Sequence, residues 1–305
     1  MKEESLLLLS DLQKLINQVV LIDYTIIILG GKTMRNSKTN ELVLTGLFTA
    51  IIIIMAFTPL GYIPLVVINA TIIHIPVILG SLFCGPKKGA FLGFVFGFTS
   101  CLKATIVGGT LSSFVFSPVL AASMVGTSGI FKSLFIAFVP RILVGVIPYF
   151  VYIGIKKVLA SEKKNLWGTV LNVLMSVFLA FGVYAFLGKM SESLSQAAAL
   201  GIGIAVGAVV FIVVEAVFIR KSIQVIPFVY AGVAGAMTNT LLVMGSIFVL
   251  YKDAYADAIG VAGNAVLGVI TGVISFNGVI EAIVAAIIVY LVGLVLNTIK
   301  PIAAK

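Results

Sequence analysis

Charged residues are scarce in this chain. They make up 10% of its 305 residues, whereas hydrophobic residues make up 61% and the mean hydropathy is +1.22. An ordinary soluble domain carries about 25% charged residues, so too few are present here to cover a water-facing surface. The scarcity excludes a soluble enzyme and a disordered chain, and it predicts an all-α integral membrane protein.

Cysteine, histidine and recognisable catalytic motifs are scarcer still. The two cysteines, Cys84 and Cys101, lie in apolar stretches and form neither a disulfide framework nor a metal-binding spacing. His74 is the single histidine, with no nucleophile near it in sequence. Motifs of metalloproteases, serine hydrolases, haem proteins and iron–sulfur proteins are absent. We therefore expect no catalytic residues, no metal and no cofactor.

Long apolar runs are what the chain has in abundance. A membrane-spanning helix needs about 20 such residues, and we predict eight spans from residue 43 onward. They cover residues 43–58, 63–84, 89–107, 133–155, 166–188, 197–219, 223–250 and 276–299. Residues 108–132 are rich in Gly and Ser, and residues 252–275 open with a polar run. Both are interpreted as loops or re-entrant segments.

The net charge of +9 is a signal of orientation. Segments on one side of the predicted spans hold twelve Lys and Arg residues, and segments on the other side hold four. Cytoplasmic loops of membrane proteins collect cations, so we predict that the N-terminus and the C-terminus both lie inside. The cations therefore do not indicate binding to nucleic acid.

Residues 1–33 do not fit this pattern, because Asp11, Lys14 and Asp23 interrupt their apolar stretch. Codons for Gly30 to Thr33 can form a bacterial ribosome-binding sequence just ahead of Met34. We interpret 1–33 as a non-native extension, with translation starting at Met34. The Gly-Lys-Thr that ends it lacks the first glycine of a P-loop, since Ile26 stands there. We expect no ATP hydrolysis by this chain itself.

Polar side chains inside the predicted spans are the candidates for function, because ionisable groups at bilayer depth are costly and face the bundle interior. Arg141 offers a planar fork that matches a carboxylate. The alternatives for Arg141 are an ion pair with an internal acid such as Glu281, or a side chain that reaches the outer surface. Glu215 is interpreted as structural, within reach of Arg220 at the cytoplasmic end.

Amides accompany these charges. Asn277 and Glu281 lie four residues apart, so they share one helix face, and Asn239 lies mid-span between two threonines. Each asparagine is either a ligand contact or an interhelical hydrogen-bonding group. His74, with Asn69 one to two turns before it, is either a satisfied internal residue or part of the same site.

Small residues recur at intervals of four on two spans. Gly89, Gly93 and Gly97 line one face of the third span, and Gly46 and Ala50 do so on the first. Such stripes let another helix approach closely. Packing within the molecule explains both stripes without any further partner.

Several motifs together resemble a known family. They are Ile68-Asn69-Ala70-Thr71-Ile72-Ile73-His74-Ile75-Pro76, Gly85-Pro86-Lys87-Lys88-Gly89-Ala90-Phe91-Leu92-Gly93, Ser113-Phe114-Val115-Phe116-Ser117-Pro118, Val139-Pro140-Arg141, Thr238-Asn239-Thr240-Leu241 and Asn277-Gly278-Val279-Ile280-Glu281. With the Gly46 stripe, they are similar to the substrate-binding S components of energy-coupling factor (ECF) transporters, most of all the pantothenate type.

The resemblance implies a high-affinity vitamin-binding subunit of an ATP-driven importer in the bacterial plasma (inner) membrane. It implies that Gly46 and Ala50 dock on a transmembrane coupling protein that works with two ATPase subunits. It also implies a pantothenate site at the outer side, capped by 59–62. The substrate-binding candidates are Arg141, Asn239, Asn277, Glu281, Asn69 and His74. Arg141 would meet the vitamin's carboxylate.

The chain departs from the six-helix S-component bundle in one segment. Residues 160–222 add a pair of apolar segments between the bundle's first four helices (34–159) and its last two (223–305). An even insertion keeps the orientation of everything after it. Two alternatives to the pantothenate interpretation remain. One is an S component for folate, a pyridoxine-type vitamin, thiamine or riboflavin. The other is a self-sufficient secondary transporter.

Overall fold

The computed structural model describes residues 37–64, 69–108, 112–190, 194–220 and 225–299, together with residue 302. The chain forms two compact units, Met1–Val43 and Leu44–Lys305. Of the first unit, residues 37–43 are described, and they form the start of a helix. The predicted non-native extension 1–33 lies outside the described residues. The second unit contains all the other described elements.

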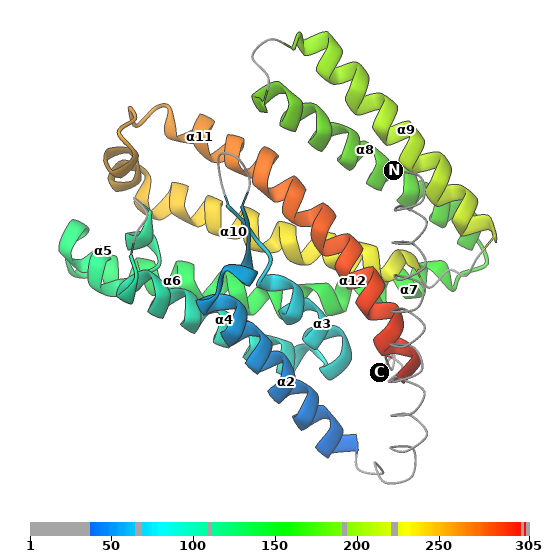
Figure 1. Cartoon of the computed structure of the whole chain (residues 1–305), viewed down its shortest axis with the longest axis horizontal. Coiled ribbons are helices and arrows are strands. Elements are labelled where there is room, and N and C mark those ends of the chain that lie inside the picture. The colour runs from blue at the N-terminus through cyan, green and yellow to red at the C-terminus, as the bar shows by residue number, and fades with distance from the viewer. Residues whose placement is uncertain are drawn as a thin grey trace, which may run out of the picture. The chain divides into compact units, whose positions relative to one another are not determined.

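The described chain is helical apart from one small hairpin, as the composition predicts (Figure 1). In chain order, the elements are α2 (Ser37–Phe57), the 3₁₀ turn η1 (Pro59–Gly61), β1 (Tyr62–Pro64), β2 (Asn69–Thr71), α3 (His74–Cys84), α4 (Pro86–Ile106), the 3₁₀ turn η2 (Ser113–Val115), α5 (Pro118–Val125), α6 (Thr127–Val144), α7 (Ile147–Leu159), α8 (Lys164–Met190), α9 (Gln196–Arg220), α10 (Val225–Ile259), α11 (Val266–Val273), the π turn η3 (Ile274–Gly278) and α12 (Val279–Ile299).

Glycine and proline set several of the helix boundaries. Gly85 separates α3 from α4 with φ of 86°, a left-handed conformation that glycine adopts without strain, and Pro86 then starts α4. Ser117 caps α5 by accepting a hydrogen bond from the Leu120 backbone N–H at 3.3 Å. These local signals turn the chain sharply between helices, so that consecutive helices pack on one another.

Six helical stretches of the described chain are long and apolar enough to cross a membrane. They are Pro86–Ile106, Thr127–Leu159, Lys164–Gly188, Gln196–Ala216, Ile226–Ile259 and Val266–Thr298. Two shorter apolar helices, Glu41–Phe57 and His74–Cys84, fall in the remaining predicted spans. The predicted span 63–84 is wrong as a single helix. Its first part is the antiparallel hairpin β1–β2, in which Tyr62 pairs with Thr71, and the helix begins only at His74.

The two predicted loops also contain more helix than expected. Within 108–132, α5 is complete and α6 begins at Thr127. Within 252–275, α10 continues to Ile259 beyond a non-helical residue at Tyr251, and α11 fills residues 266–273. The polar run 252–257 therefore belongs to the end of a long helix. The polar residues led to a wrong prediction of a loop. A helix can extend beyond the apolar layer of a membrane, because its backbone hydrogen bonds are formed within the helix and persist in water.

Two large apolar clusters and a small third one form the core among the described residues of the second unit. The first contains Ile52 of α2, Phe96 of α4 and Phe228 of α10, among others. The second cluster contains residues of η2, α5, α6, the last turns of α10, and α11, among them Phe114 and Tyr251.

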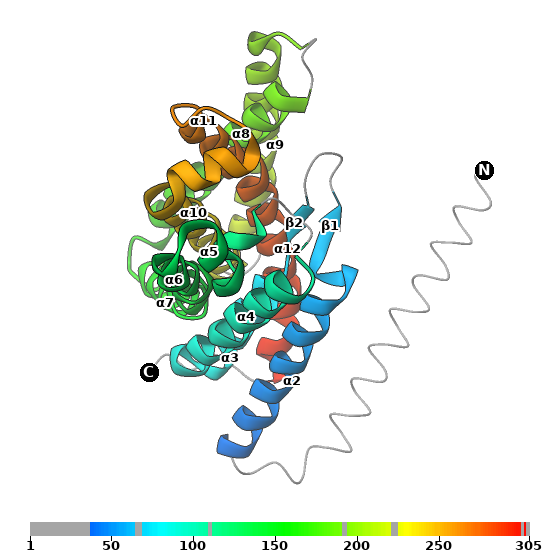
Figure 2. The same ribbon diagram turned by 90° about the vertical axis from the view of Figure 1, so that its left-hand side faces the viewer.

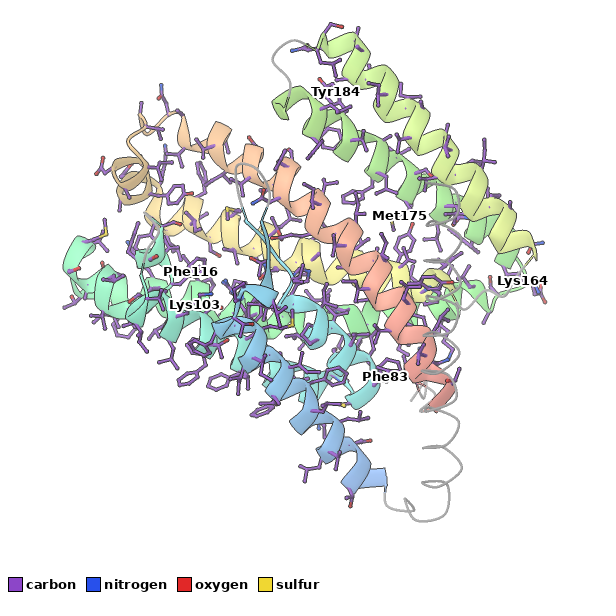
Figure 3. All side chains as sticks on the ribbon, viewed as in Figure 1. Phe83, Lys103, Phe116, Lys164, Met175 and Tyr184 are labelled. Carbon is purple, nitrogen blue, oxygen red and sulfur yellow. The ribbon has the colours of Figure 1, made fainter. Side chains whose placement is uncertain are left out.

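A hydrogen bond from a charged side chain, 2.9 Å long, joins the ends of two helices. There, Lys103 Nζ near the end of α4 donates to the Ala56 carbonyl in the last turn of α2. Figure 3 labels Lys103.

Over the predicted pair of additional segments the structure has two helices, α8 and α9, which run side by side (Figure 1). Gly203 and Gly207 of α9 lie against Ala180 and Ser176 of α8, where a larger residue would meet backbone atoms. Small residues at this spacing let the two helices approach closely.

Candidate functional site

Glu281 is the point where three distant parts of the chain meet. One carboxylate oxygen accepts a hydrogen bond from the Thr71 backbone N–H at 2.8 Å, and the other accepts one from Thr240 Oγ1 at 2.8 Å. The side chain is 5% exposed. Strand β2, helix α10 and helix α12 are thereby held together through one buried carboxylate. Figure 2 shows the hairpin beside α12.

Arg141 lies in the last turn of α6 and is 6% exposed. Its guanidinium carbon is 5.4 Å from the ring centroid of Phe96 and 4.6 Å from that of Phe116, which Figure 3 labels. Nη1 donates to the Ile136 carbonyl at 2.7 Å. The two rings and this bond restrict the guanidinium to one position between the two apolar clusters. Arg141 also acts electrostatically on Glu281.

The backbone of Arg141 is placed by the glycine stripe of α4. A side-chain carbon on Gly93 would collide with the Arg141 carbonyl. Likewise, a side-chain carbon on Gly89 would collide with the Gly145 carbonyl, and one on Gly97 would collide with the Ala137 carbonyl. The α4 stripe therefore packs inside the molecule, and it brings α6 close enough for Phe96 to reach the guanidinium.

Two amides are nearly completely buried on the neighbouring helices. Asn277 lies in the π turn η3, and Asn239 lies in α10 directly before Thr240. The Oδ1 atom of each accepts no hydrogen bond from the described residues. A buried polar atom without a partner costs about 1–3 kcal/mol, so these two oxygens favour a polar ligand that supplies the missing donors.

The remaining predicted site residues lie at the hairpin. His74 is fully buried in the first turn of α3, and its ring lies against the backbone of Thr71. The Thr71 N–H in turn donates to Glu281. The backbone of Asn69 pairs with Pro64 in the hairpin, and its side chain lies outside the described part of the structure.

The arrangement suits a small polar anion. One fixed guanidinium matches a carboxylate, and two amide oxygens lie free to accept hydrogen bonds. Within the described residues, no group of three or more His, Cys, Asp or Glu side chains is arranged to hold a metal ion. A sequence model of the family described as ECF transporter, substrate-specific component, matches residues 40–220, more than half of the chain. The chain belongs to this family.

Two relatives are similar to this S component over long stretches. The pantothenic acid transporter PanT of Lactococcus lactis subsp. cremoris is 42% identical over 161 residues, which cover 49% of this chain and 78% of the relative. The pantothenate transporter PanT of Leuconostoc mesenteroides subsp. mesenteroides is 27% identical over 277 residues, which cover 89% of this chain and 98% of the relative.

This S component is a multi-pass integral protein of the bacterial plasma membrane, in agreement with its family and its long apolar helices. The family match extends to residue 220 and so includes the α8–α9 pair. The segment 160–222, which the sequence analysis treats as an addition to the six-helix bundle, therefore lies almost wholly inside the matched range.

The predicted docking residues of the S component are placed differently from the α4 stripe. Gly46 and Ala50 are both exposed on α2, and a side-chain carbon on Gly46 would meet no atom within 4 Å. Packing within the molecule, which explains the α4 stripe, therefore does not explain Gly46 among the described residues.

Glu215 lies outside this site. Its two carboxylate oxygens accept hydrogen bonds from Thr169 Oγ1 and Asn172 Nδ2, each at 2.6 Å, so it joins α9 to α8. The expected partner, Arg220, has a side chain outside the described residues. The neighbours that the structure does show are neutral and come from the other helix of the pair. The spacing of residues along α9 could not predict these partners, because they lie on α8.

Sequence reasoning missed four contributors to the site. The Thr71 backbone N–H and the Thr240 hydroxyl bind Glu281, and both residues stand inside motifs quoted for the family resemblance. Phe116 also stands in such a motif, whereas Phe96 had no signal beyond its place between Gly93 and Gly97. Aromatic rings in an apolar sequence do not show which of them face a cation.

Proposed function

We propose that this S component is the high-affinity pantothenate-binding subunit of an ATP-driven ECF importer. The observation that carries the proposal is the buried guanidinium of Arg141, held between Phe96 and Phe116, which acts electrostatically on the buried Glu281. The names of the two PanT relatives support the choice of vitamin. Pantothenate has a carboxylate, an amide and two hydroxyl groups, which need these kinds of partner.

Each polar side chain then has a separate role. Arg141 binds the carboxylate of the vitamin through its fork of donors. The Oδ1 atoms of Asn239 and Asn277 accept hydrogen bonds from the amide and hydroxyl groups. Each oxygen of Glu281 already accepts one protein hydrogen bond, so its role is to hold the hairpin and to accept a further hydroxyl. Asn69 and His74 border the ligand from the hairpin side.

Transport requires partners in this proposal. The exposed Gly46 and Ala50 face of α2 docks on a transmembrane coupling protein, which works with two ATPase subunits. Small residues on an exposed membrane helix support this role, because they allow a partner helix to approach closely. The chain itself hydrolyses no ATP.

The topology completes the proposal. We infer eight membrane segments with both termini inside, built as the S-component bundle (34–159 and 223–305) with the pair 160–222 inserted. The excess of cations on one side of the predicted spans supports the orientation. Native translation starts at Met34. An intact N-terminus at Met1, measured by mass spectrometry of the natively expressed protein, would contradict the start of translation at Met34.

The deciding experiment is purification in detergent followed by mass spectrometry of the small molecules that accompany the protein. We expect pantothenate, with a dissociation constant in the nanomolar range. A different vitamin would overturn the substrate and keep the family role. Ion-driven uptake by the chain alone in proteoliposomes would overturn the dependence on ATPase partners.

The role of Arg141 is tested by Arg141→Ala. Removing one partner of a buried charged pair costs about 2–5 kcal/mol, so we expect pantothenate affinity to fall at least about thirtyfold. The matched control is Lys132→Ala, about 13 Å away along α6. Lys132 also lies over an aromatic ring, that of Tyr251 at 5.6 Å. Unchanged affinity in Arg141→Ala would remove the carboxylate role.

A further inference from the structure

Helix α8 is the member of the α8–α9 pair that contacts the rest of the bundle at defined points. Near its start, the Leu171 carbonyl accepts a hydrogen bond from Tyr230 Oη of α10 at 2.5 Å. Farther along, Gly182 and Phe186 reach the junction between α11 and α12. Figure 1 shows α8 between α9 and α12. The two contacts at the junction lie directly beside the proposed ligand site.

These two contacts hold both sides of Asn277. The Phe186 ring stacks on that of Phe276 with centroids 4.9 Å apart and planes 13° apart. At Gly182, an added side-chain carbon would collide with the branched side chain of Val279. Phe276 directly precedes Asn277, and Val279 follows it by two residues. Helix α8 thus packs on the turn that carries the amide.

The opposite side of the same turn faces α10. A side-chain carbon on Gly278 would lie 3.0 Å from Thr240 Cγ2, and the Thr240 hydroxyl donates to Glu281. The π turn η3 is therefore enclosed between α8 and α10. A shift of either helix would move Asn277 relative to Arg141 and Glu281.

The turn needs such support for a physical reason. π turns are rare, and they occur mostly as single turns inside helices, often at functional sites. The Asn277 Oδ1 atom is buried without a hydrogen bond from the described residues, so no bond to that atom fixes the direction of the amide. The backbone of the turn sets where the amide lies, and packing on that backbone helps to hold it there.

We propose that α8 fixes the π turn that presents Asn277, so that Gly182 and Phe186 are positioning residues for the ligand site. In this proposal the α8–α9 pair supports the binding pocket, because Gly182 and Phe186 of α8 pack on the turn that carries Asn277. The identity of the ligand in this inference rests on the proposed function. The part that says α8 holds the conformation of the π turn rests on the α8 contacts alone.

The experiment uses the full chain in detergent and three variants. Phe186→Ala removes the stacked ring, and Phe186→Tyr keeps a ring for rescue. Phe181→Ala is the matched control, because it removes the same ring from the same helix at a position that is 56% exposed. Two quantities are measured: backbone hydrogen exchange of residues 274–281 without ligand, and the affinity for pantothenate.

We expect faster exchange across 274–281 in Phe186→Ala and wild-type exchange in Phe181→Ala and Phe186→Tyr. Loss of an aromatic pair corresponds to an affinity about three- to tenfold weaker, and Phe186→Tyr should restore it. Unchanged exchange in Phe186→Ala would overturn the inference, and so would faster exchange with unchanged affinity. If the wild-type protein binds no pantothenate, the proposed function fails, and the exchange data still decide whether α8 holds the turn.

Discussion

The small-residue stripes of α2 and α4 have the same spacing and opposite surroundings. On α4, Gly89, Gly93 and Gly97 each face a backbone carbonyl of the α6–α7 region, so no side chain fits there. On α2, Gly46 faces open space and Ala50 is exposed. The α4 stripe packs against other helices of the molecule, whereas the α2 stripe lies on its surface. Spacing alone shows that a helix can come close, whereas the structure shows whether one has done so.

The largest effect is expected from Gly93→Leu. The new side chain collides with the Arg141 backbone, and a misfit of this kind in a packed interior costs about 1–3 kcal/mol or more. We expect a lower melting temperature in detergent and loss of pantothenate binding. Gly46→Leu is the matched control and should melt like the wild type. Equal melting of the two variants would contradict the difference between the stripes.

The next effect separates binding from transport. Gly46→Leu combined with Ala50→Leu should keep pantothenate affinity and melting temperature, while vitamin uptake by cells falls about tenfold, because bulky side chains prevent close helix approach. The control is Gly154→Leu, at another exposed glycine with no atom within 4 Å of an added side-chain carbon. Normal uptake with normal assembly in the double variant would remove the docking role of α2.

A smaller effect is expected from Gly97→Ala. The added methyl group meets the Ala137 carbonyl and the Phe138 ring, which pushes α6 away from α4 and moves Arg141. We expect a loss of about 1–2 kcal/mol in stability and affinity for pantothenate about threefold weaker. Thermal unfolding and calorimetric titration measure the two quantities. A more stable Gly97→Ala protein would show that α6 tolerates the shift.

The smallest effect has the opposite sign. Gly46→Ala adds a methyl group in open space, and alanine favours a helix over glycine by about 0.5–1 kcal/mol. We expect a slightly higher melting temperature with unchanged affinity, as in Gly154→Ala. Destabilisation by Gly46→Ala would mean that the α2 stripe already packs against the chain.

Much of the fold could be predicted from sequence, because apolar length governs where membrane helices form. The helices around Gly93, Arg141, Asn239 and Glu281, and the additional pair, were all predicted. The hairpin was missed, since hydropathy does not separate an apolar extended segment from an apolar helix. The helical part of 252–275 was missed because polar residues at a helix end resemble a loop.

The candidate site was predictable in its ionisable members and unpredictable in its contacts. The cost of placing a charge in the membrane singled out Arg141 and Glu281, and the structure brings them close enough to interact. The bond from Thr71 to Glu281 joins residues 210 positions apart, so no local pattern could show it. For Glu215, sequence proximity suggested Arg220, whereas its observed partners lie on the preceding helix.

The bond from Lys103 to the Ala56 carbonyl has a mechanical consequence. It fastens the end of α2 to the end of α4, and α4 in turn carries the Arg141 backbone against Gly93. A force applied to α2 from outside therefore reaches α4 through this bond as well as through the apolar cluster that contains Ile52 and Phe96, and Phe96 lies against the guanidinium. In the proposed role of Arg141, tilting of α2 would therefore affect the binding of the vitamin's carboxylate without any contact between α2 and the vitamin.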